Sequence, residues 1–271
     1  MIQRIAHLFR SGKTAVPSAP EYRPAPNNQL LIGQTALVSG AAGLIGSAIV
    51  AELLSQGADV TAIDCDGAGL AALENAAGSS RLAAQICDLT DANQIARLDA
   101  RNCDLLIHAA GVQVETTALD DTDLQWSQSL DANVAGPVRL TRKMLPALIR
   151  NKGSIIMVSS IHAALPSRWA NYSAAKAAQD ATMREWSIDL APHGVRVNSV
   201  APGWVSAVVK PSKLALLRQQ TIPPEYIARA VTVLASDYYS RFTTGSVVSV
   251  DAGASHYSGR VPFDLPTAKD G

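Results

Sequence analysis

Cysteine, aromatic residues and net charge are all scarce in this chain of 271 residues. Only three cysteines occur, Cys65, Cys87 and Cys103, and their spacing matches no metal-binding motif. They lie in or beside apolar stretches, which predicts buried thiols in a reducing compartment, so we interpret the protein as cytoplasmic. The 23 basic residues balance the 23 acidic residues, so no overall field would attract nucleic acid or an anionic membrane.

Several classes of protein are disfavoured by motifs that do not occur. No apolar run approaches the roughly 20 residues that a helix needs to cross a bilayer, so we expect no membrane span. No His-x-x-x-His motif or acidic cluster has metal spacing, so we expect no metal. The Gly-x-Ser-x-Gly turn of serine hydrolases does not occur either. A content of 48% hydrophobic residues is enough for the core of one soluble domain.

The two ends of the chain differ from its middle. A short basic segment and a proline-rich polar stretch predict a flexible N-terminal extension over 1–32. Its apolar spacing and its lack of acidic residues before Glu21 faintly resemble a transit peptide, and the alternatives are a disordered arm or an arm that packs on a partner subunit. We place one domain at 33–254. The tail at 255–271 is expected either to reach a neighbouring subunit or to be disordered.

From Gln34 onward, short β-rich runs alternate with helical stretches, which is typical of a parallel sheet with helices on both faces. We therefore predict an α/β doubly wound Rossmann fold with a single seven-stranded parallel sheet flanked by helices. Two long helices are expected at about 124–148 and 171–190, with Asp123 and Asn171 as N-caps. The expected strands are 35–39, 59–63, 82–87, 105–109, 154–159, 196–200 and 246–250.

A glycine-rich turn joins the first expected strand to a helix. Its glycines are Gly40, Gly43 and Gly46, with Leu44 and Ile45 between the last two. Glycines permit a tight turn and let the backbone approach a pyrophosphate, while the free amides at the helix start attract the anion. The turn therefore predicts dinucleotide binding. The alternative is a turn glycine with two packing glycines.

Acidic residues follow the second and third expected strands. Asp64 stands 18 residues after Gly46, where a carboxylate binds the ribose hydroxyls of NAD and repels the 2′-phosphate of NADP. Because no Arg or Lys occurs in 64–67, we predict NAD as the preferred cofactor. The alternative is that Asp64 begins a turn with Asp66. Asp88 is expected either to contact the adenine ring or to cap the next turn.

Tyr172 and Lys176 lie one helical turn apart, so their side chains share one face of a helix. A phenol has a pKa of about 10 in water, and a nearby positive charge moves that pKa toward neutral pH. The pair therefore predicts proton exchange with a carbonyl or alcohol oxygen. Taken alone, the Tyr-x-x-x-Lys spacing is also common in ordinary amphipathic helices.

These motifs stand in the order seen in one family, together with His108-Ala109-Ala110-Gly111, Pro202-Gly203 and Thr244-Gly245. The chain resembles the compact single-domain branch of the short-chain dehydrogenase/reductase family over about 34–253. The resemblance implies that Tyr172 exchanges a proton with the substrate, that Lys176 binds the nicotinamide ribose, that Ser160 bonds the substrate oxygen and that Asn133 holds a relaying water. Strand alignment selects Ser160, whereas the family's usual spacing selects Ser159. The implied cofactor contacts are Gly40, Gly43, Leu44, Ile45, Gly46, Asp64, Asp88, Leu89, Ala110, Gly111, Tyr172, Lys176, Pro202, Gly203 and Val205.

The chain also departs from the family pattern. Leu44 stands where the middle glycine is usual, and Ala207 stands where a threonine usually binds the nicotinamide amide. His108 replaces an asparagine, and we expect it to be buried, hydrogen-bonded and without catalytic work. The substrate lid over 205–222 is short and includes a helix-prone stretch at 214–218. Substrate contacts are expected from this lid and from Gln113, His162, Arg168, Trp169 and Trp204.

Taken together, the sequence predicts an NAD-dependent oxidoreductase that interconverts a secondary alcohol and a ketone on a small molecule. One alternative is a catalytically weak or inactive relative that serves as an NAD-binding sensor or structural protein. A nucleotide-sugar epimerase or dehydratase is a second alternative, although the chain lacks the large C-terminal substrate region of those enzymes. The family resemblance implies a homodimer or homotetramer that packs through the two long helices, and the amphipathic segment at 171–190 suits such packing.

Overall fold

The computed structural model describes residues 29–256 and contains one sheet of seven strands, all of them parallel. The strand order is β3-β2-β1-β4-β5-β6-β7, so the predicted doubly wound fold is confirmed. Each strand lies within two residues of its expected position at either end. The strands are β1 (Thr35–Ser39), β2 (Asp59–Asp64), β3 (Leu82–Ile86), β4 (Leu105–His108), β5 (Ser154–Val158), β6 (Arg196–Pro202) and β7 (Val247–Val250).

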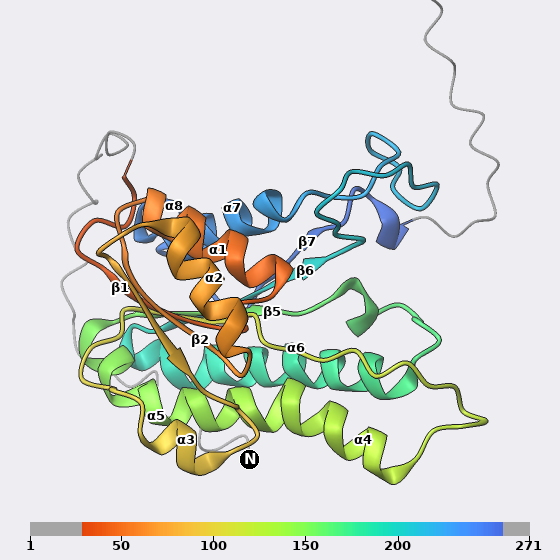
Figure 1. Cartoon of the computed structure of the whole chain (residues 1–271), viewed down its shortest axis with the longest axis horizontal. Coiled ribbons are helices and arrows are strands. Elements are labelled where there is room, and N and C mark those ends of the chain that lie inside the picture. Colours follow the sequence, from red (N-terminus) through yellow and green to blue (C-terminus); the bar gives the residue numbers. More distant parts are fainter. Residues whose placement is uncertain (1–28, 257–271) are drawn as a thin grey trace, which may run out of the picture.

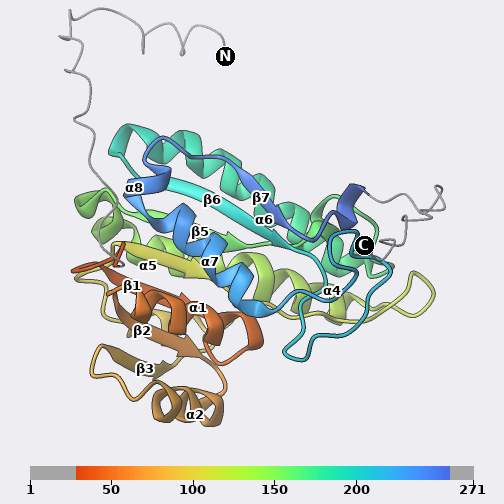
Figure 2. The same ribbon diagram turned by 90° about the horizontal axis from the view of Figure 1, so that it is seen from above.

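Helices cover both faces of the sheet and give the molecule three layers (Figures 1 and 2). One face carries α1 (Leu44–Ser55), α2 (Gly67–Ala77), α7 (Pro224–Ala235) and α8 (Asp237–Ser240). The other carries α3 (Ala92–Ala96), α4 (Asp123–Leu130), α5 (Gly136–Asn151) and α6 (Ala170–Leu190). A π-helical turn, η2 (Asp131–Ala135), joins α4 to α5, and short 3-10 turns occur at η3 (Ile161–Ala163), η4 (Ala191–His193) and η5 (Ala254–His256).

The sheet separates two apolar cores. Successive strand residues point to opposite faces, so Val38 packs toward the α1 and α7 side while Leu37 packs toward the α5 side. The first core includes Ile49 of α1 and the second includes Met144 of α5, both without exposed surface. Because both faces are covered, the central strands read as continuous apolar runs in the sequence rather than as alternating ones.

The chain changes its winding direction at β1, which has β2 on one side and β4 on the other. The connections that follow these strands leave toward opposite faces of the sheet, so a crevice forms beyond their carboxyl ends. The glycine turn follows β1 and residues 109–111 follow β4. The fold therefore brings both of these predicted binding segments to the same crevice.

The starts of the two long helices differ from our expectation. Thr122, not Asp123, is the N-cap of α4, and its hydroxyl accepts the backbone N–H of Gln125. Asn171 lies inside α6, where its buried side chain donates to the Thr116 hydroxyl instead of capping the helix. The expected helix over 124–148 is interrupted by η2, whose wider turn was not evident from the apolar spacing.

The folded part of the chain begins ahead of residue 33, where we had placed the domain boundary. Leu31 is fully buried in the core and its backbone N–H donates to Gln56. The remainder of the predicted extension and the tail beyond His256 lie outside the described residues. None of the helices described is long and apolar enough to span a membrane.

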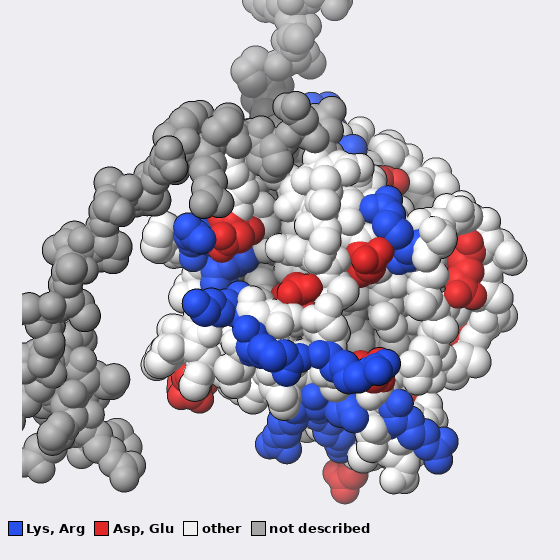
Figure 3. Space-filling view, turned by 90° about the vertical axis from the view of Figure 1, so that its left-hand side faces the viewer, with Lys and Arg blue, Asp and Glu red and all other residues white. Residues whose placement is uncertain are grey.

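Charge is unevenly distributed despite a formal net charge of zero. Figure 3 views the end of the molecule that lies on the left in Figure 1, where Lys and Arg side chains form a band. Arg81, Arg101 and Lys152 lie in the connections that lead into β3, β4 and β5. Positive side chains therefore gather at the amino ends of the strands, opposite the crevice.

Candidate functional site

A cavity of about 720 Å³ opens at the carboxyl ends of the strands, beside the crevice between β1 and β4. This volume lies within the range of small-molecule and cofactor sites. Seven of the predicted cofactor residues line it: Gly40, Gly43, Asp64, Asp88, Leu89, Ala110 and Gly111. The residues that we had not predicted include Ala42, Cys65, Asp66, Thr90, Val112, Val114, Ser127, Gln128, Asp131 and Ala132.

The glycine turn is shaped by close backbone contacts that no side chain could tolerate. Gly40 has a φ of +68°, and a methyl group there would collide with the backbone of Ala110 after β4. A methyl group on Gly46 would collide with the carbonyl oxygen of Gly40. The turn therefore packs directly on the end of β4 and on the start of α1, which leaves its backbone exposed to the cavity.

The start of α1 is suited to an anion. Gly43 is the N-cap and offers no side-chain acceptor, and no acidic residue occurs in the first turn. The first backbone N–H groups of a helix have no acceptor within the helix, and the helix dipole adds positive charge there. Leu44, Ile45 and Gly46 are not among the residues that line the cavity, and Leu44 is exposed. Their contribution to a pyrophosphate site would come from backbone amides.

Asp64 is held in place by two backbone hydrogen bonds. Its Oδ2 accepts the N–H of Ala42 at 3.0 Å, and its Oδ1 accepts the N–H of Asp66 at 3.0 Å. The carboxylate therefore lies at the cavity wall with both oxygens able to accept one further bond. Asp66, Asp88 and Asp131 also line the cavity, whereas none of its described lining residues is Lys or Arg. The residues present fit a dinucleotide, with carboxylates available to its hydroxyl groups.

Asp88 both caps a turn and lines the cavity. Its Oδ1 accepts the N–H and the hydroxyl of Thr90, each at 2.8 Å. The hydrogen bonds of Asp88 are therefore those of a turn cap. Its position on the cavity wall also leaves room for the expected contact with the adenine ring. Cys65 follows β2 and is exposed beside this wall, so our expectation of three buried thiols was wrong for this residue.

Tyr172 and Lys176 share one face of α6, as their spacing predicts. The Lys176 nitrogen lies 5.8 Å from the centre of the Tyr172 ring. The same nitrogen donates to the backbone carbonyl of Val158 at 3.0 Å, at the end of β5. Lys176 is buried, with 5% of its surface exposed. Packing against β5 therefore fixes the ammonium group beside the phenol.

The pKa of Tyr172 shifts in the direction opposite to the one we expected. Burial raises the pKa of the phenol, and the hydrogen bond with Ser160 lowers it by less. Burial also lowers the pKa of Lys176 to about 8. The physical reason is that α6 removes both groups from water, and desolvation disfavours the charged form of each.

The two candidate serines have different environments. Ser160 lowers the pKa of the Tyr172 phenol, and its hydroxyl accepts the N–H of His162 at 3.1 Å. Ser159 is buried and its hydroxyl has no hydrogen-bond partner. The ring of His162 contacts both Tyr172 and Trp204, with centroids 6.5 and 5.7 Å apart. The His162 ring therefore connects Tyr172 to Trp204, two residues that are far apart in the sequence but both near the expected substrate position.

Asn133 lies in the π-helical turn and is fully buried. Its amide nitrogen donates to the carbonyls of Val112 and Ser129, both at 2.9 Å, while its Oδ1 has no partner. A methyl group on Gly111 would come within 2.7 Å of that oxygen and 3.3 Å of the Lys176 nitrogen. Gly111, which lines the cavity, thus connects it to Asn133 and Lys176. Single π-turns often occur at functional sites.

Other predicted contacts lie apart from the cavity wall. Pro202 ends β6 and Gly203 donates its N–H to Val250, while Val205 forms an isolated bridge with Ile222. The hydroxyl of Ser206 donates to the Val208 carbonyl at 2.8 Å. The stretch at 214–218, which we expected to favour a helix, forms turns, and Leu217 donates its N–H to the Ala252 carbonyl.

His108 is fully buried at the end of β4, as expected, but only half hydrogen-bonded. Its Nε2 lies 2.8 Å from the Thr141 hydroxyl, and its Nδ1 has no partner. Burial lowers the pKa of His108 to about 3, so the ring is neutral. Within residues 29–256, no group of three or more His, Cys, Asp or Glu side chains is arranged to hold a metal ion.

Known proteins resemble this chain over most of its length. The family model described as short chain dehydrogenase matches residues 34–215. The chain belongs to the short-chain dehydrogenase family. Members of this family are oxidoreductases that act on CH–OH and C=O groups with a nicotinamide cofactor.

Relatives of this chain carry more specific names. The 3-oxoacyl-[acyl-carrier-protein] reductase FabG of Thermotoga maritima is 29% identical over 82% of this chain and 98% of its own length. The 2-keto-3-deoxy-L-fuconate dehydrogenase of Xanthomonas campestris is 31% identical over 86% of this chain and 84% of its own. The crystal structure of a short-chain oxidoreductase from Burkholderia thailandensis superposes with a TM-score of 0.77, at 31% identity, over 83% of this chain and 93% of that one.

Proposed function

We propose that this short-chain dehydrogenase is an NAD(H)-dependent oxidoreductase that interconverts a secondary alcohol and a ketone on a small molecule. The observation that carries the proposal is the position of Gly111. This residue lines the large cavity, and the space that its missing side chain leaves is bordered by Asn133 and Lys176. A nucleotide in the cavity would therefore end beside the Tyr172 and Lys176 pair.

The residues that would hold the nucleotide are those of the cavity wall. The α1 amides and the glycine turn would bind the pyrophosphate. Asp64 would accept hydrogen bonds from the ribose hydroxyls. The preference for NAD rests on the acidic lining, which would repel a 2′-phosphate. Asp88 and Leu89 would border the base, and Pro202, Gly203 and Val205 would approach the nicotinamide end. When bound, the nicotinamide ring supplies or accepts the hydride.

The chain's own residues would handle the proton. Tyr172 would donate its phenolic proton to the oxygen of a ketone and, in the reverse direction, accept one from an alcohol. Ser160 would donate a hydrogen bond to the same oxygen as negative charge develops there. Lys176 would bind the ribose and favour the phenolate. Asn133, whose Oδ1 is buried without a partner, would hold a water that relays protons toward Lys176.

The names of two relatives support this reaction type. One is a reductase of a 3-oxoacyl group and the other a dehydrogenase of a keto-deoxy sugar acid, so both are named for chemistry at a carbonyl or alcohol carbon. We further propose that the protein works in the cytoplasm. Self-association into a homodimer or homotetramer would use α5 and α6.

The test is a panel of secondary alcohols with NAD and with NADP, in which the absorbance of the reduced cofactor is followed. We expect turnover with NAD that Tyr172→Phe lowers by at least about 100-fold while the affinity for NAD changes little. NAD binding without turnover of any substrate would instead favour a sensor or structural role. Turnover that survives Tyr172→Phe would refute the assigned mechanism.

A further inference from the structure

A buried carboxylate lies one helical turn beyond Lys176 on α6. Asp180 follows Lys176 by four residues, so the two side chains point to the same side of the helix. Each has only 5% of its surface exposed. A carboxylate is rarely buried to this extent unless other groups compensate its charge, so its partners need to be identified.

The partner that fixes Asp180 comes from the sheet. The hydroxyl of Ser199, in β6, donates to Asp180 Oδ1 at 2.9 Å. Ser199 is fully buried, and its backbone N–H donates to Ser246 at the start of the β7 pairing. Because β6 is an interior strand, Ser199 cannot move without disturbing the sheet. The carboxylate therefore has a fixed position under Lys176.

Asp180 is the negative group in the surroundings of the Lys176 ammonium. On α6 the neighbours are Tyr172 and, one helical turn further on, Asp180, while β5 contributes the neutral carbonyl of Val158 and η2 the neutral side chain of Asn133. Among the described residues Lys176 makes no direct ion pair within 4.0 Å. The attraction therefore acts through the buried interior, where it is screened less than in water.

We infer that Asp180 is a positioning residue for the proposed reaction. Its carboxylate, fixed by Ser199, keeps the Lys176 ammonium protonated beside Tyr172. This inference rests on the proposed function, because it assigns to Asp180 a role exerted only through Lys176. It extends the acid–base pair into a row of three residues, at positions i, i+4 and i+8 of α6, that ends on the sheet.

The pKa directions explain why the group is needed. Burial lowers the pKa of Lys176 and Asp180 raises it again, so the two effects oppose each other. Burial also raises the pKa of the Tyr172 phenol. If Lys176 lost its proton near neutral pH, no positive charge would remain beside the phenol to favour phenolate formation. The carboxylate therefore widens the pH range in which Tyr172 can act as a base.

The test uses Asp180→Asn in the full-length enzyme. The amide oxygen can still accept the bond from Ser199, so the change removes charge with little change of shape. In alcohol oxidation with NAD, we expect the midpoint of the rising limb of kcat against pH to move upward by about one unit, with about a tenfold lower kcat at pH 7. The KM for the alcohol should change less than about twofold, because Asp180 touches no substrate.

Two further variants isolate the effect. Asp180→Glu restores a carboxylate and should return the midpoint toward that of the wild type. Asp189→Asn removes an exposed acid from the same helix and should leave the midpoint unchanged. A uniform loss of activity at every pH in Asp180→Asn, with no shift of the midpoint, would identify a merely structural residue and overturn the inference.

Failure of the inference can be told from failure of the proposed function. If wild-type turnover depends on Tyr172 but the pH profile of folded Asp180→Asn matches the wild type, only the role of Asp180 is refuted. If the wild type turns over no alcohol with NAD, the proposed function fails first. If circular dichroism shows that Asp180→Asn does not fold, Ser199→Ala is tested instead. This variant removes the bond that fixes the Asp180 carboxylate near Lys176, so the midpoint should shift in the same direction. An unchanged midpoint would refute the role of Asp180.

Discussion

The carboxylate of Asp64 accepts the backbone N–H of Ala42 across 3.0 Å. This bond joins the end of β2 to the glycine turn that follows β1. The residue that we expect to bind the ribose therefore also holds the loop that we expect to bind the phosphates. A substitution at Asp64 consequently removes the charge while keeping the bond to the glycine turn, or removes both, depending on the side chain introduced.

The first prediction separates these two roles. Asp64→Asn keeps an oxygen that can accept the Ala42 N–H but removes the negative charge and the acceptor of the Asp66 N–H, so NAD affinity should fall by roughly tenfold while NADP affinity rises. Asp64→Ala also frees the turn and should weaken both nucleotides. The measurement is isothermal titration of each variant with NAD and NADP.

A matched control lies two residues away. Asp66→Asn also removes one charge from the cavity wall, while the Asn oxygen can still cap α2 through Ala68 and Gly69. We expect its preference for NAD to stay close to that of the wild type. Equal loss of preference in Asp64→Asn and Asp66→Asn would show that the general field of the cavity, rather than bonds from Asp64, selects the cofactor.

The second prediction concerns the contact between the glycine turn and β4. Gly40→Ala combines a positive φ with a collision against the Ala110 backbone, so it should destabilise the fold by about 2–3 kcal/mol and weaken NAD binding by more than tenfold. Gly33→Ala has a similar φ of +74° but no atom within 4 Å of the added methyl group. It should cost only about 1 kcal/mol.

Urea unfolding of both variants, with and without NAD, checks this prediction. The difference between them isolates the close approach of the turn to β4, because the backbone conformation is penalised in both. If Gly33→Ala and Gly40→Ala lose equal stability and bind NAD equally well, the contact with Ala110 has no role in forming the nucleotide site.

The fold was predictable because its signals are local. Each strand of the parallel sheet is a short apolar run bounded by turn residues, and the glycine turn stands between a strand and a helix. Helix starts were less predictable. We expected Asn171 to cap α6, but its side chain donates a hydrogen bond to Thr116, which is distant in the sequence. A cap and a buried partner look alike until the tertiary contact is known.

The site was predictable in part for the same reason. Strand ends such as Asp64 and Asp88 meet at one edge of any parallel sheet, so their place on the cavity wall follows from topology. Ser127 and Gln128 of α4 also line the cavity, but nothing in their local sequence indicates this. The upward pKa shift of Tyr172 depends on burial by the whole fold, which spacing alone does not report.

A third prediction follows from the buried imidazole of His108. In the unfolded chain this side chain takes up a proton below its ordinary pKa of 6.5, whereas burial in the folded protein lowers the pKa to about 3. Between these values the unfolded state binds more protons, so stability falls as the pH falls. Over pH 7 to 5 the loss from this residue should be about 2 kcal/mol.

His108→Asn is the variant that checks the imidazole. It removes the titrating group, so the free energy of unfolding in urea should fall by about 2 kcal/mol less between pH 7 and 5 than in the wild type. The comparison uses the change with pH rather than the absolute stability, because the variant also alters the contact with Thr141. Parallel losses in the two proteins would contradict the buried neutral state of His108.

The last prediction contrasts a buried cation with an exposed ion pair. Arg196 is 9% exposed and donates to the carbonyls of Leu234 and Ala235, at 2.6 and 2.7 Å, at the end of α7. Arg196→Met fills similar space but leaves two buried carbonyls without a donor. We expect a loss of about 3 kcal/mol, measured as a fall in Tm of roughly 10 °C.

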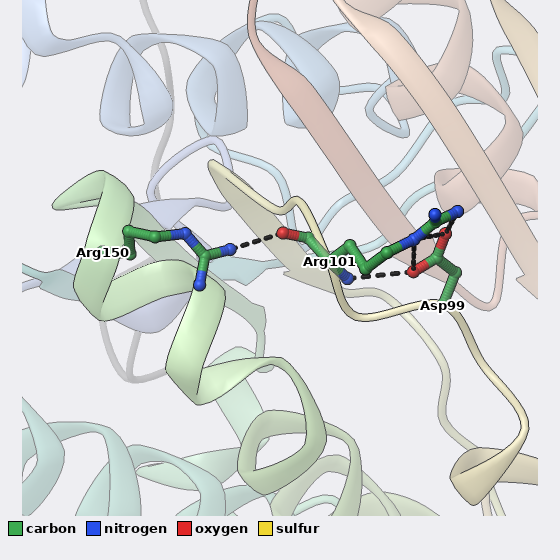
Figure 4. A network of polar contacts seen from close by, with 3 residues as sticks. All are labelled: Asp99, Arg101 and Arg150. Carbon is green, nitrogen blue, oxygen red and sulfur yellow. Dashed lines mark hydrogen bonds and ion pairs between the residues drawn. The ribbon is translucent and has the colours of Figure 1, made fainter.

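The exposed pair of Asp99 and Arg101 provides the control (Figure 4). Arg101 lowers the pKa of Asp99 to about 2, yet both side chains are mostly exposed to water. Arg150 donates to the backbone carbonyl of Arg101, so this contact survives when the Asp99 charge is removed. Asp99→Asn should therefore leave Tm unchanged within error at physiological salt, because solvent screens the pair. An equal fall in Tm for Asp99→Asn and Arg196→Met would contradict the prediction. It would show that an exposed ion pair stabilises this fold as much as a buried, hydrogen-bonded arginine.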